Sequence, residues 1–371
     1  MLAAFVSACS VPEAVRRLGD VAPTPHERYA RSLTDAGLHE TALGREWLAA
    51  ADTSLHAALT ITLPFREAGY YDRSEARAVA WRFSLREGSR LSVSLVSEGL
   101  PAQIFLDLFE QTSDTTSPYR HRVSAEPDSG ISHEIRESAT YVLRVQPELL
   151  RSGRFEITIR IDPMLAFPVD GRGNSAVQSL FGVARDGGRR EHHGIDIFAP
   201  RGTPVIAAAD GFVRSTTPSN LGGKVVWLRD QQRGQSLYYA HLDSQLVSPG
   251  QQVSMGDTIG FVGNTGNART TRPHLHFGIY SRGRGPIDPF PYVRLVTAQP
   301  PAIRADTQQL GVRAKTRNAS TIVREAPVAS ADSVRRVERD AAIWIMGVAG
   351  NWYRVQLDDG TAGYVPANSV R

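Results

Sequence analysis

The sequence predicts a mainly β protein of several domains: a β-sandwich near the N-terminus, an antiparallel β-sheet domain in the middle and a small C-terminal β-barrel. The chain of 371 residues is longer than one ordinary domain. Apolar and polar residues alternate with a period of two over much of it, which is typical of half-buried strands. The chain also has 32 glycines and 22 prolines, which favour turns and separate these alternating runs. Hydrophobic residues make up 41% and charged residues 22%, which excludes wholesale disorder.

Charge and cysteine content exclude several classes of protein. The formal net charge is only +4, without the clustered basic stripe of a nucleic-acid binder, so we expect no nucleic-acid partner. Because Cys9 is the single cysteine, the chain has no intramolecular disulfide and no cysteine-based zinc cage. No run of 18 apolar residues is present, so the sequence predicts no transmembrane helix.

Residues 1–22 read as a signal-like and linker segment. The start MLAAFVSACS resembles the lipobox of bacterial lipoproteins, in which the cysteine is lipidated, and would then anchor the chain to a membrane through Cys9. Against this, the eight residues before Cys9 contain no Lys or Arg, whereas a signal peptide has a charged n-region. A frayed terminus with an incidental thiol is the second interpretation, and both stay open.

Residues 23–55 are expected to be helical. Thr24 stands as N-cap, Pro25 at the first helical position and Glu27 at the third, which is the spacing of a capping box. A break near Gly37 predicts two short helices.

Residues 56–163 are expected to form the sandwich. Four apolar side chains alternate with polar or small ones between Val79 and Leu85, and the pattern recurs in four later segments. The segment 140–161 resembles the closing hairpin of small jelly-roll domains that accompany secreted peptidases.

The middle domain, residues 164–295, carries an unusual group of histidines. Five of the ten histidines fall between 192 and 276. His192 precedes Asp196 by four residues with a glycine between them, so both side chains can converge on one point. His274 and His276 project from the same face of one strand, because they are two residues apart. His241 supplies a further imidazole at a strand end.

This set of side chains favours a catalytic metal site. Two imidazoles and one carboxylate around zinc leave a fourth position for water, which distinguishes a catalytic site from a closed structural one. Zinc acidifies such a water, and further histidines can move protons and stabilise an oxyanion. The reaction class predicted is metal-assisted amide hydrolysis.

The segments HHGID, YAHL and PHLHFGI, in this order, resemble the lysostaphin-type (LytM-like) zinc metallopeptidases, which cut peptidoglycan peptides. The resemblance covers about residues 165 to 292. It includes APRGTPVIAAADGFV, SPGQQVSMGDTIGFVGNTG and a closing PIDPFPY. It implies a lysostaphin-like antiparallel β-sheet catalytic domain.

The resemblance also implies a role for each site residue. His192, Asp196 and His276 would be the ligands of one zinc ion, and His241 and His274 the catalytic pair. His274 would be the general base and His241 an oxyanion or water-orienting partner, although one sequence leaves this division open.

Two further features of the middle domain have plainer interpretations. His193 is one residue out of register with Asp196, so we expect it at the surface or behind the ligands. Gly260, Gly263 and Gly266 are expected in turns, because no strand-loop-helix unit supports phosphate binding.

After a linker at 296–307, residues 308–371 resemble a small bacterial SH3-like β-barrel. Its signature is Trp352, Tyr353 and Val355 in one strand, then a DDG turn and a second strand. Such barrels bind cell-wall peptides; alternatively, Trp352 only fills the core.

The chain is thus expected to be a zinc endopeptidase of the bacterial cell envelope that acts on peptidoglycan stem peptides. Three alternatives stay open: a catalytically silent activator of another wall hydrolase, a zinc peptidase with a protein substrate, and a wall-binding adaptor. The bond that is cut, inhibition by the N-terminal region and the oligomeric state are not predicted.

Overall fold

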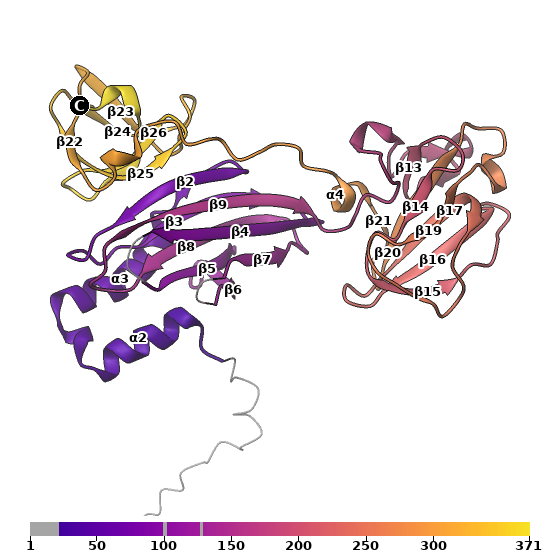
Figure 1. Ribbon diagram of the computed structural model, residues 1–371, viewed down its shortest axis with the longest axis horizontal. Coiled ribbons are helices and arrows are strands. Elements are labelled where there is room, and N and C mark those ends of the chain that lie inside the picture. Colours follow the sequence, from indigo (N-terminus) through magenta and orange to yellow (C-terminus); the bar gives the residue numbers. More distant parts are fainter. Residues whose placement is uncertain (1–21, 99–101, 127–128) are drawn as a thin grey trace, which may run out of the picture.

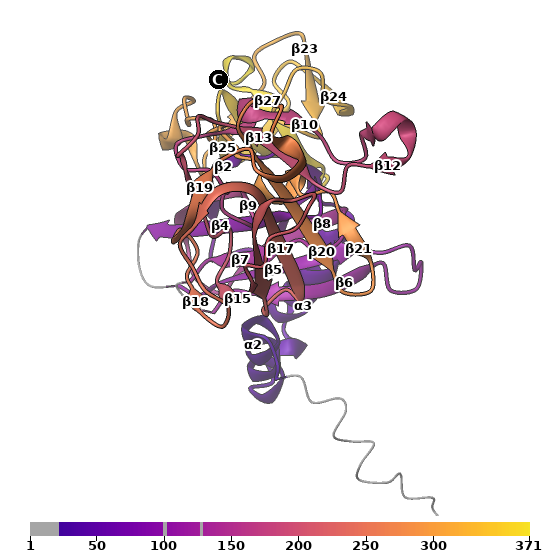
Figure 2. The ribbon, with the colours of Figure 1, turned by 90° about the vertical axis from the view of Figure 1, so that its right-hand side faces the viewer.

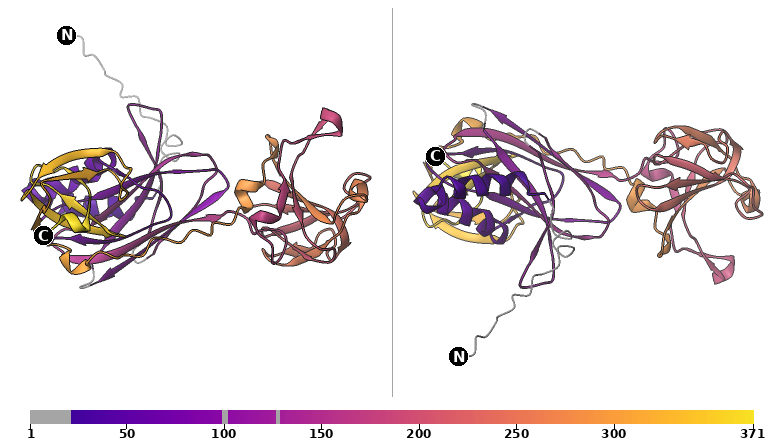
Figure 3. Two further views of the ribbon diagram at one scale, coloured as in Figure 1. Left: turned by 90° about the horizontal axis from the view of Figure 1, so that it is seen from above. Right: turned by 90° about the horizontal axis from the view of Figure 1, so that it is seen from below.

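The computed structural model describes residues 22–98, 102–126 and 129–371, which form two lobes (Figure 1). The first lobe holds the N-terminal helices, a β-sandwich and the C-terminal strands; the second is formed by residues 164–293. Views from above and below show the same separation (Figure 3). The predicted mainly β architecture is confirmed. The lipobox-like segment with Cys9 lies outside the described residues.

Two helices and a short 3-10 turn begin the first lobe: α2 (Pro25–Asp35), Leu38–Glu40 and α3 (Ala42–His56). Thr24 and Glu27 form the predicted capping box, and Gly37 breaks the helices with a φ of 71°. Trp47 of α3 is fully buried, and its indole N–H donates to the carbonyl oxygen of Pro147 at 2.8 Å. Among the described residues, no helix is long and apolar enough to cross a membrane.

Two sheets pack face to face behind these helices. The first has the order β1 (Leu59–Thr60), β3 (Val79–Leu85), β8 (Ala139–Pro147), β5 (Ile104–Gln111), β6 (Tyr119–Ser124). The second runs β2 (Phe65–Tyr71), β9 (Gly153–Pro163), β4 (Ser89–Glu98), β7 (Ile131–Glu134). Trp81, Leu143 and Ile157 are fully buried between them. The pairing is antiparallel except between β1 and β3, which are parallel.

The C-terminal strands continue the second sheet. They are β22 (Arg313–Lys315), β23 (Ser320–Arg324), β24 (Ser333–Glu338), β25 (Ala342–Ala349), β26 (Trp352–Gln356) and β27 (Ala362–Pro366). Strand β25 pairs with β2, with Ala68 opposite Val348. Tyr364 is fully buried as part of the sandwich core, and half-buried Trp352 packs against that core. The sheet is therefore continuous across two segments that the sequence analysis treats as separate units.

The second lobe is built on one antiparallel sheet with the order β10, β13, β20, β17, β16, β15, β18. The bounds of these strands are Val177–Ser179, Ile195–Phe198, His274–Ser281, Gln235–Gln245, Lys224–Asp230, Gly211–Ser215 and Gln252–Val253. Further pieces are β11 (Ala184–Arg185), β12 (Arg190–Glu191), β14 (Pro204–Ile206), β19 (Thr258–Val262), β21 (Gly285–Ile287) and α4 (Phe290–Val293). Figure 2 shows the small β11–β12 hairpin standing out from this lobe.

Ion pairs and hydrogen bonds join the two lobes. Arg233, between β16 and β17, pairs with Glu134 of β7. Glu87 of the first lobe accepts hydrogen bonds from the Tyr292 hydroxyl and from Arg284, both at 2.6 Å. After α4, the chain runs back to the first lobe as an extended segment (Figure 1).

Candidate active site

Strands β13 and β20 bring the predicted site residues together. In their antiparallel register, Asp196 lies opposite His276 and Phe198 opposite His274. Residues directly opposite each other in a sheet share a face, so the carboxylate and both imidazoles project to the same side. Leu275 is fully buried on the other face. His274 and His276 therefore lie on the same face of β20, as their two-residue spacing predicts.

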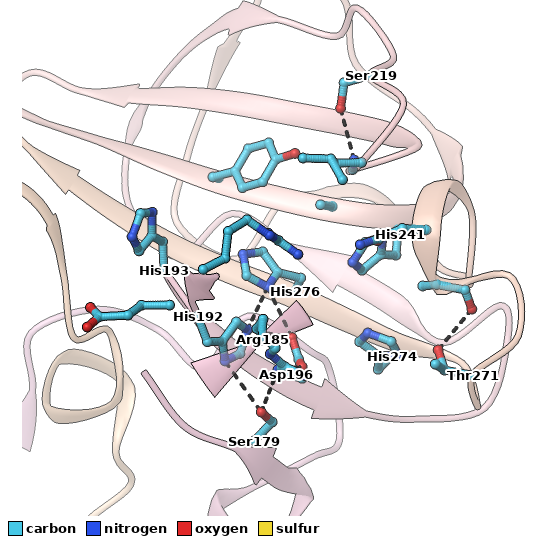
Figure 4. A pocket seen from close by; sticks show the side chains of 18 of the residues that line it. Ser179, Arg185, His192, His193, Asp196, Ser219, His241, Thr271, His274 and His276 are labelled. Atoms are coloured by element: carbon cyan, nitrogen blue, oxygen red, sulfur yellow. Dashed lines mark hydrogen bonds and ion pairs between the residues drawn. The ribbon is translucent and has the colours of Figure 1, made fainter. Parts of the chain in front are cut away.

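His192, Asp196 and His276 form a compact triangle of potential ligand atoms (Figure 4). The Nε2 of His192 lies 3.0 Å from Oδ1 of Asp196 and 2.9 Å from Nδ1 of His276, and the third side measures 3.0 Å. Zinc bonds of about 2.0 Å in a tetrahedron separate ligand atoms by about 3.3 Å. The triangle is thus close to the size that such an ion requires.

Neighbouring groups fix which atoms face the centre of the triangle. His192 donates from Nδ1 to the carbonyl oxygen of Leu180 at 2.8 Å, so its neutral ring presents a lone pair at Nε2. Arg185 donates to Oδ2 of Asp196 at 2.7 Å and leaves Oδ1 for the centre. Two lone pairs 3.0 Å apart repel each other unless a cation lies between them, so these donors fit a metal ion.

Electrostatics keep the triangle in its ligating form. Burial alone would raise the pKa of the Asp196 carboxyl, but the imidazoles of His192 and His276 in contact with it hold that pKa well below its usual range. Burial is also the main cause that lowers the pKa of His276. At neutral pH the carboxylate is therefore charged and the imidazole of His276 is neutral, as metal ligands must be.

His241 and His274 lie beside the triangle with one ring nitrogen each turned to the pocket. Nδ1 of His241 donates to the carbonyl oxygen of Thr265 at 2.9 Å, and Nδ1 of His274 to that of Arg272 at 2.8 Å. Their ring centroids are 5.1 Å apart. Because Nδ1 of each ring donates to a carbonyl oxygen, each Nε2 is left to accept a proton. This geometry suits proton transfer.

The backbone at His241 is unusual, with a φ of 62° in a residue that is not glycine. Its N–H donates to the carbonyl oxygen of Gly222 at 2.8 Å. A Cβ on Gly223 would meet Thr265 Oγ1 at 2.2 Å, and one on Gly266 would meet the carbonyl oxygen of Leu221 at 2.3 Å. These glycines allow two loops to approach each other behind the His241 ring.

The structure assigns the three predicted glycines to two kinds of position. Gly266 has a φ of 71° and begins a short 3-10 turn, as predicted. Gly260 lies within β19, where a Cβ would meet the carbonyl oxygen of Ser244 at 2.5 Å. Gly263 similarly lies against the backbone of Asp243. Turn formation is therefore the wrong explanation for Gly260, where close strand packing requires glycine.

A pocket of about 800 Å³ surrounds the histidines, and every residue that lines it belongs to the segment 178–280. An aromatic group forms part of its lining: Trp227 lies 4.3 Å from Tyr238 and 5.1 Å from Tyr280, measured between ring centroids. His193 is exposed at its edge and outside the triangle, where the sequence analysis expects it.

Sequence reasoning did not single out this aromatic group or Arg185. A signal was present for the aromatic residues, because Tyr280 follows His276 by an even number of residues, and Tyr238 lies opposite Gly278 on the same face. Arg185 reaches Asp196 from the short β11–β12 hairpin, and no spacing rule connects that hairpin with the site.

Comparison with known proteins matches this part of the chain. Residues 190–289 match the family model described as "Peptidase family M23". The L-Ala--D-Glu endopeptidase of Bacillus subtilis is 37% identical over 140 residues, covering 35% of this chain and 43% of that protein. Peptidoglycan DD-endopeptidase ShyA of Vibrio cholerae is 43% identical over 95 residues, covering 25% and 21%. The chain thus spans less than half the length of either relative.

Solved structures with similarity to the chain include LytU, at 35% identity and a TM-score of 0.30, covering 33% of this chain and 87% of that one. The catalytic domain of lysostaphin from Staphylococcus simulans is 28% identical with a TM-score of 0.28, covering 35% and 91%. The family match falls on the lobe that holds the histidine and aspartate triangle. Residues 190–289 of this chain are a peptidase family M23 domain.

Proposed function

We propose that this protein is a zinc-dependent endopeptidase that hydrolyses peptide bonds in the stem peptides of peptidoglycan. The observation that carries the proposal is the triangle of His192, Asp196 and His276 at the floor of an open pocket, with two further histidines beside it. The relatives named above as peptidoglycan endopeptidases support the substrate class. A bacterial envelope location follows from that substrate, and lipidation of Cys9 stays a prediction.

The three ligands would hold one zinc ion, which supplies a Lewis acid and an acidified water. Arg185 and the carbonyl oxygen of Leu180 keep the ligand side chains oriented. His274, through its free Nε2, is proposed to accept the proton of the attacking water. His241, about 5 Å from His274 between ring centroids, is proposed to orient the water by accepting a hydrogen bond at Nε2, or to stabilise the developing oxyanion once Nε2 has taken up a proton.

The complete triangle and the open pocket favour an enzyme over a silent activator. None of the described residues of the helices, the sandwich or the C-terminal strands lines the pocket. The described part of the first lobe therefore leaves the site accessible to an extended peptide.

The test is mass spectrometry of soluble fragments released from purified sacculi by the wild type, His276→Ala and the control His193→Ala, with zinc measured on each. We expect zinc and peptide-cleaved fragments for the wild type and zinc retention by the control. His276→Ala should bind no zinc and release no fragments, because only two protein ligands remain for the ion. A wild type without zinc would favour the activator, and a zinc-loaded wild type that leaves sacculi intact but cuts protein would favour the protein substrate.

A further inference from the structure

Arg272 lies at the rim of the pocket and is held there from two directions. Its guanidinium carbon lies 4.8 Å from the ring centroid of Phe198, and its Nη2 donates to Oε1 of Gln178 at 2.7 Å. Phe198 in turn stacks on His274, with 4.9 Å between the ring centroids. The side chain is exposed, yet the two contacts define its position beside a proposed catalytic histidine.

Arg272 differs from Arg185, another arginine in the lining of the pocket. Arg185 forms an ion pair with Asp196, so its charge is compensated within the site. The contacts of Arg272 are with an amide oxygen and an aromatic ring, and no carboxylate of the described residues forms an ion pair with it. An oriented guanidinium has five N–H donors, of which this one uses few, and its fork matches a carboxylate.

We propose that Arg272 binds a free carboxylate of the stem peptide and makes the enzyme select carboxylate-bearing peptides over amidated ones. This inference rests on the proposed function. The two ring contacts from Arg272 to His274 span about 10 Å at most, and an extended peptide advances about 3.3 Å per residue. The recognised carboxylate therefore lies within about three residues of the bond that is cut.

Two carboxylates of a stem peptide have this chemistry: the α-carboxylate of the γ-linked D-glutamyl residue, and that of the diamino acid. Amidation of either one replaces an anion by a neutral group of nearly the same shape. It thus removes the charge-assisted part of the contact while the peptide can still enter the pocket.

The experiment measures kcat and KM of the zinc-loaded full chain on three synthetic stem peptides: one with both carboxylates free, one amidated at the D-glutamyl residue and one amidated at the diamino acid. Wild type should lose about tenfold in kcat/KM on the peptide amidated at the recognised position. Arg272→Ala should have the same roughly tenfold lower kcat/KM already on the peptide with both carboxylates free, and its kcat/KM should not differ among the three peptides. Arg272→Lys should be intermediate, because it keeps the charge without the planar fork.

Arg269→Ala is the matched control, since Arg269 is an exposed arginine of the same loop outside the pocket lining. It should behave as wild type. Equal losses for Arg272→Ala on all three peptides, or a wild type that does not distinguish them, would overturn the proposal.

Calorimetric binding of the same peptides separates this inference from the proposed function. If the wild type cleaves none of the peptides, the proposed function fails. The affinities of the wild type and of Arg272→Ala for these peptides then still test whether Arg272 binds a carboxylate. Weaker binding by Arg272→Ala of the two peptides that keep the recognised carboxylate, with unchanged binding of the third, supports the carboxylate contact, whereas binding unaffected by the substitution refutes it.

Discussion

At the scale of single residues, His241 combines a strained backbone with an unusual imidazole. A left-handed conformation costs a non-glycine residue about 1–2 kcal/mol. Here the backbone N–H of His241 donates to Gly222 and its ring Nδ1 donates to Thr265, and these two bonds hold the residue in place. Burial, followed by the charges of His274 and His276, lowers the pKa of His241 to about 4. The ring is therefore neutral above about pH 5, with its Nε2 available to the substrate.

This conformation determines which substitution tests the role of His241. Asparagine tolerates the left-handed region better than alanine, so His241→Asn should keep the loop intact. We expect kcat to fall about 100-fold to 10,000-fold, which is the usual contribution of a positioned proton donor or acceptor, with zinc fully retained. Rates on stem peptides and metal analysis check this; loss of zinc together with activity would contradict the assignment of His241 outside the ligand set.

At the scale of elements, a buried network of hydrogen bonds stabilises the contact between β2 and the C-terminal strands. Glu67 is fully buried in β2 and accepts hydrogen bonds from the Tyr364 hydroxyl and from Nε of Arg354, both at 2.8 Å. The Tyr364 hydroxyl also accepts from the indole N–H of Trp81 at 3.0 Å. The sandwich and the C-terminal strands thus provide hydrogen-bond partners for each other's buried polar groups.

Removal of the Tyr364 hydroxyl should destabilise this junction. Tyr364→Phe leaves a carboxylate oxygen of Glu67 and the N–H of Trp81 without that partner, so we expect the free energy of unfolding to fall by about 1–3 kcal/mol. Urea unfolding measures the change. The control Tyr70→Phe removes a hydroxyl bonded to nearby Asp72 at a half-buried site and should have less effect; equal losses would argue against the network.

Local sequence patterns predict single helices and strands well, but they predict less well which strands pair with each other. The alternation from Val79 to Leu85 and the capping box of Thr24 are local rules, and both are confirmed. The four- and two-residue spacings of the histidines and Asp196 favour a metal site, whereas the choice of His192, Asp196 and His276 as its ligands comes from the family resemblance; these three side chains do lie together in the structure. The pairing of β2 with β25 depends on complementary edges far apart in the sequence, for which periodicity holds no information.

At the scale of the whole molecule, Glu134 links the lobes and makes their contact sensitive to pH. Burial alone would raise its pKa, but Arg233 and Arg90 lower it below the usual value. A carboxyl whose pKa is lower in the folded state stabilises that state above its unfolded pKa of about 4.3. The stabilisation is lost as the pH falls through the lower, folded value.

Glu134→Gln should therefore lower the free energy of unfolding at pH 7 by about 2 kcal/mol and flatten its decline between about pH 5 and pH 3. Urea unfolding of the full chain at several pH values measures both effects. Glu156→Gln is the control, because Glu156 pairs with Arg66 at an exposed site and should change stability by less than about 1 kcal/mol. Parallel pH profiles for wild type and Glu134→Gln would refute the assignment.

The continuous sheet of the first lobe also has a consequence for biosynthesis. Arg354 follows its partner Glu67 by 287 residues, and the whole M23 domain is translated between them. Until β25 leaves the ribosome, the edge of β2 that it will cover has no strand partner, and such an edge invites pairing with other chains. The sandwich therefore completes its folding only after the M23 domain has been translated.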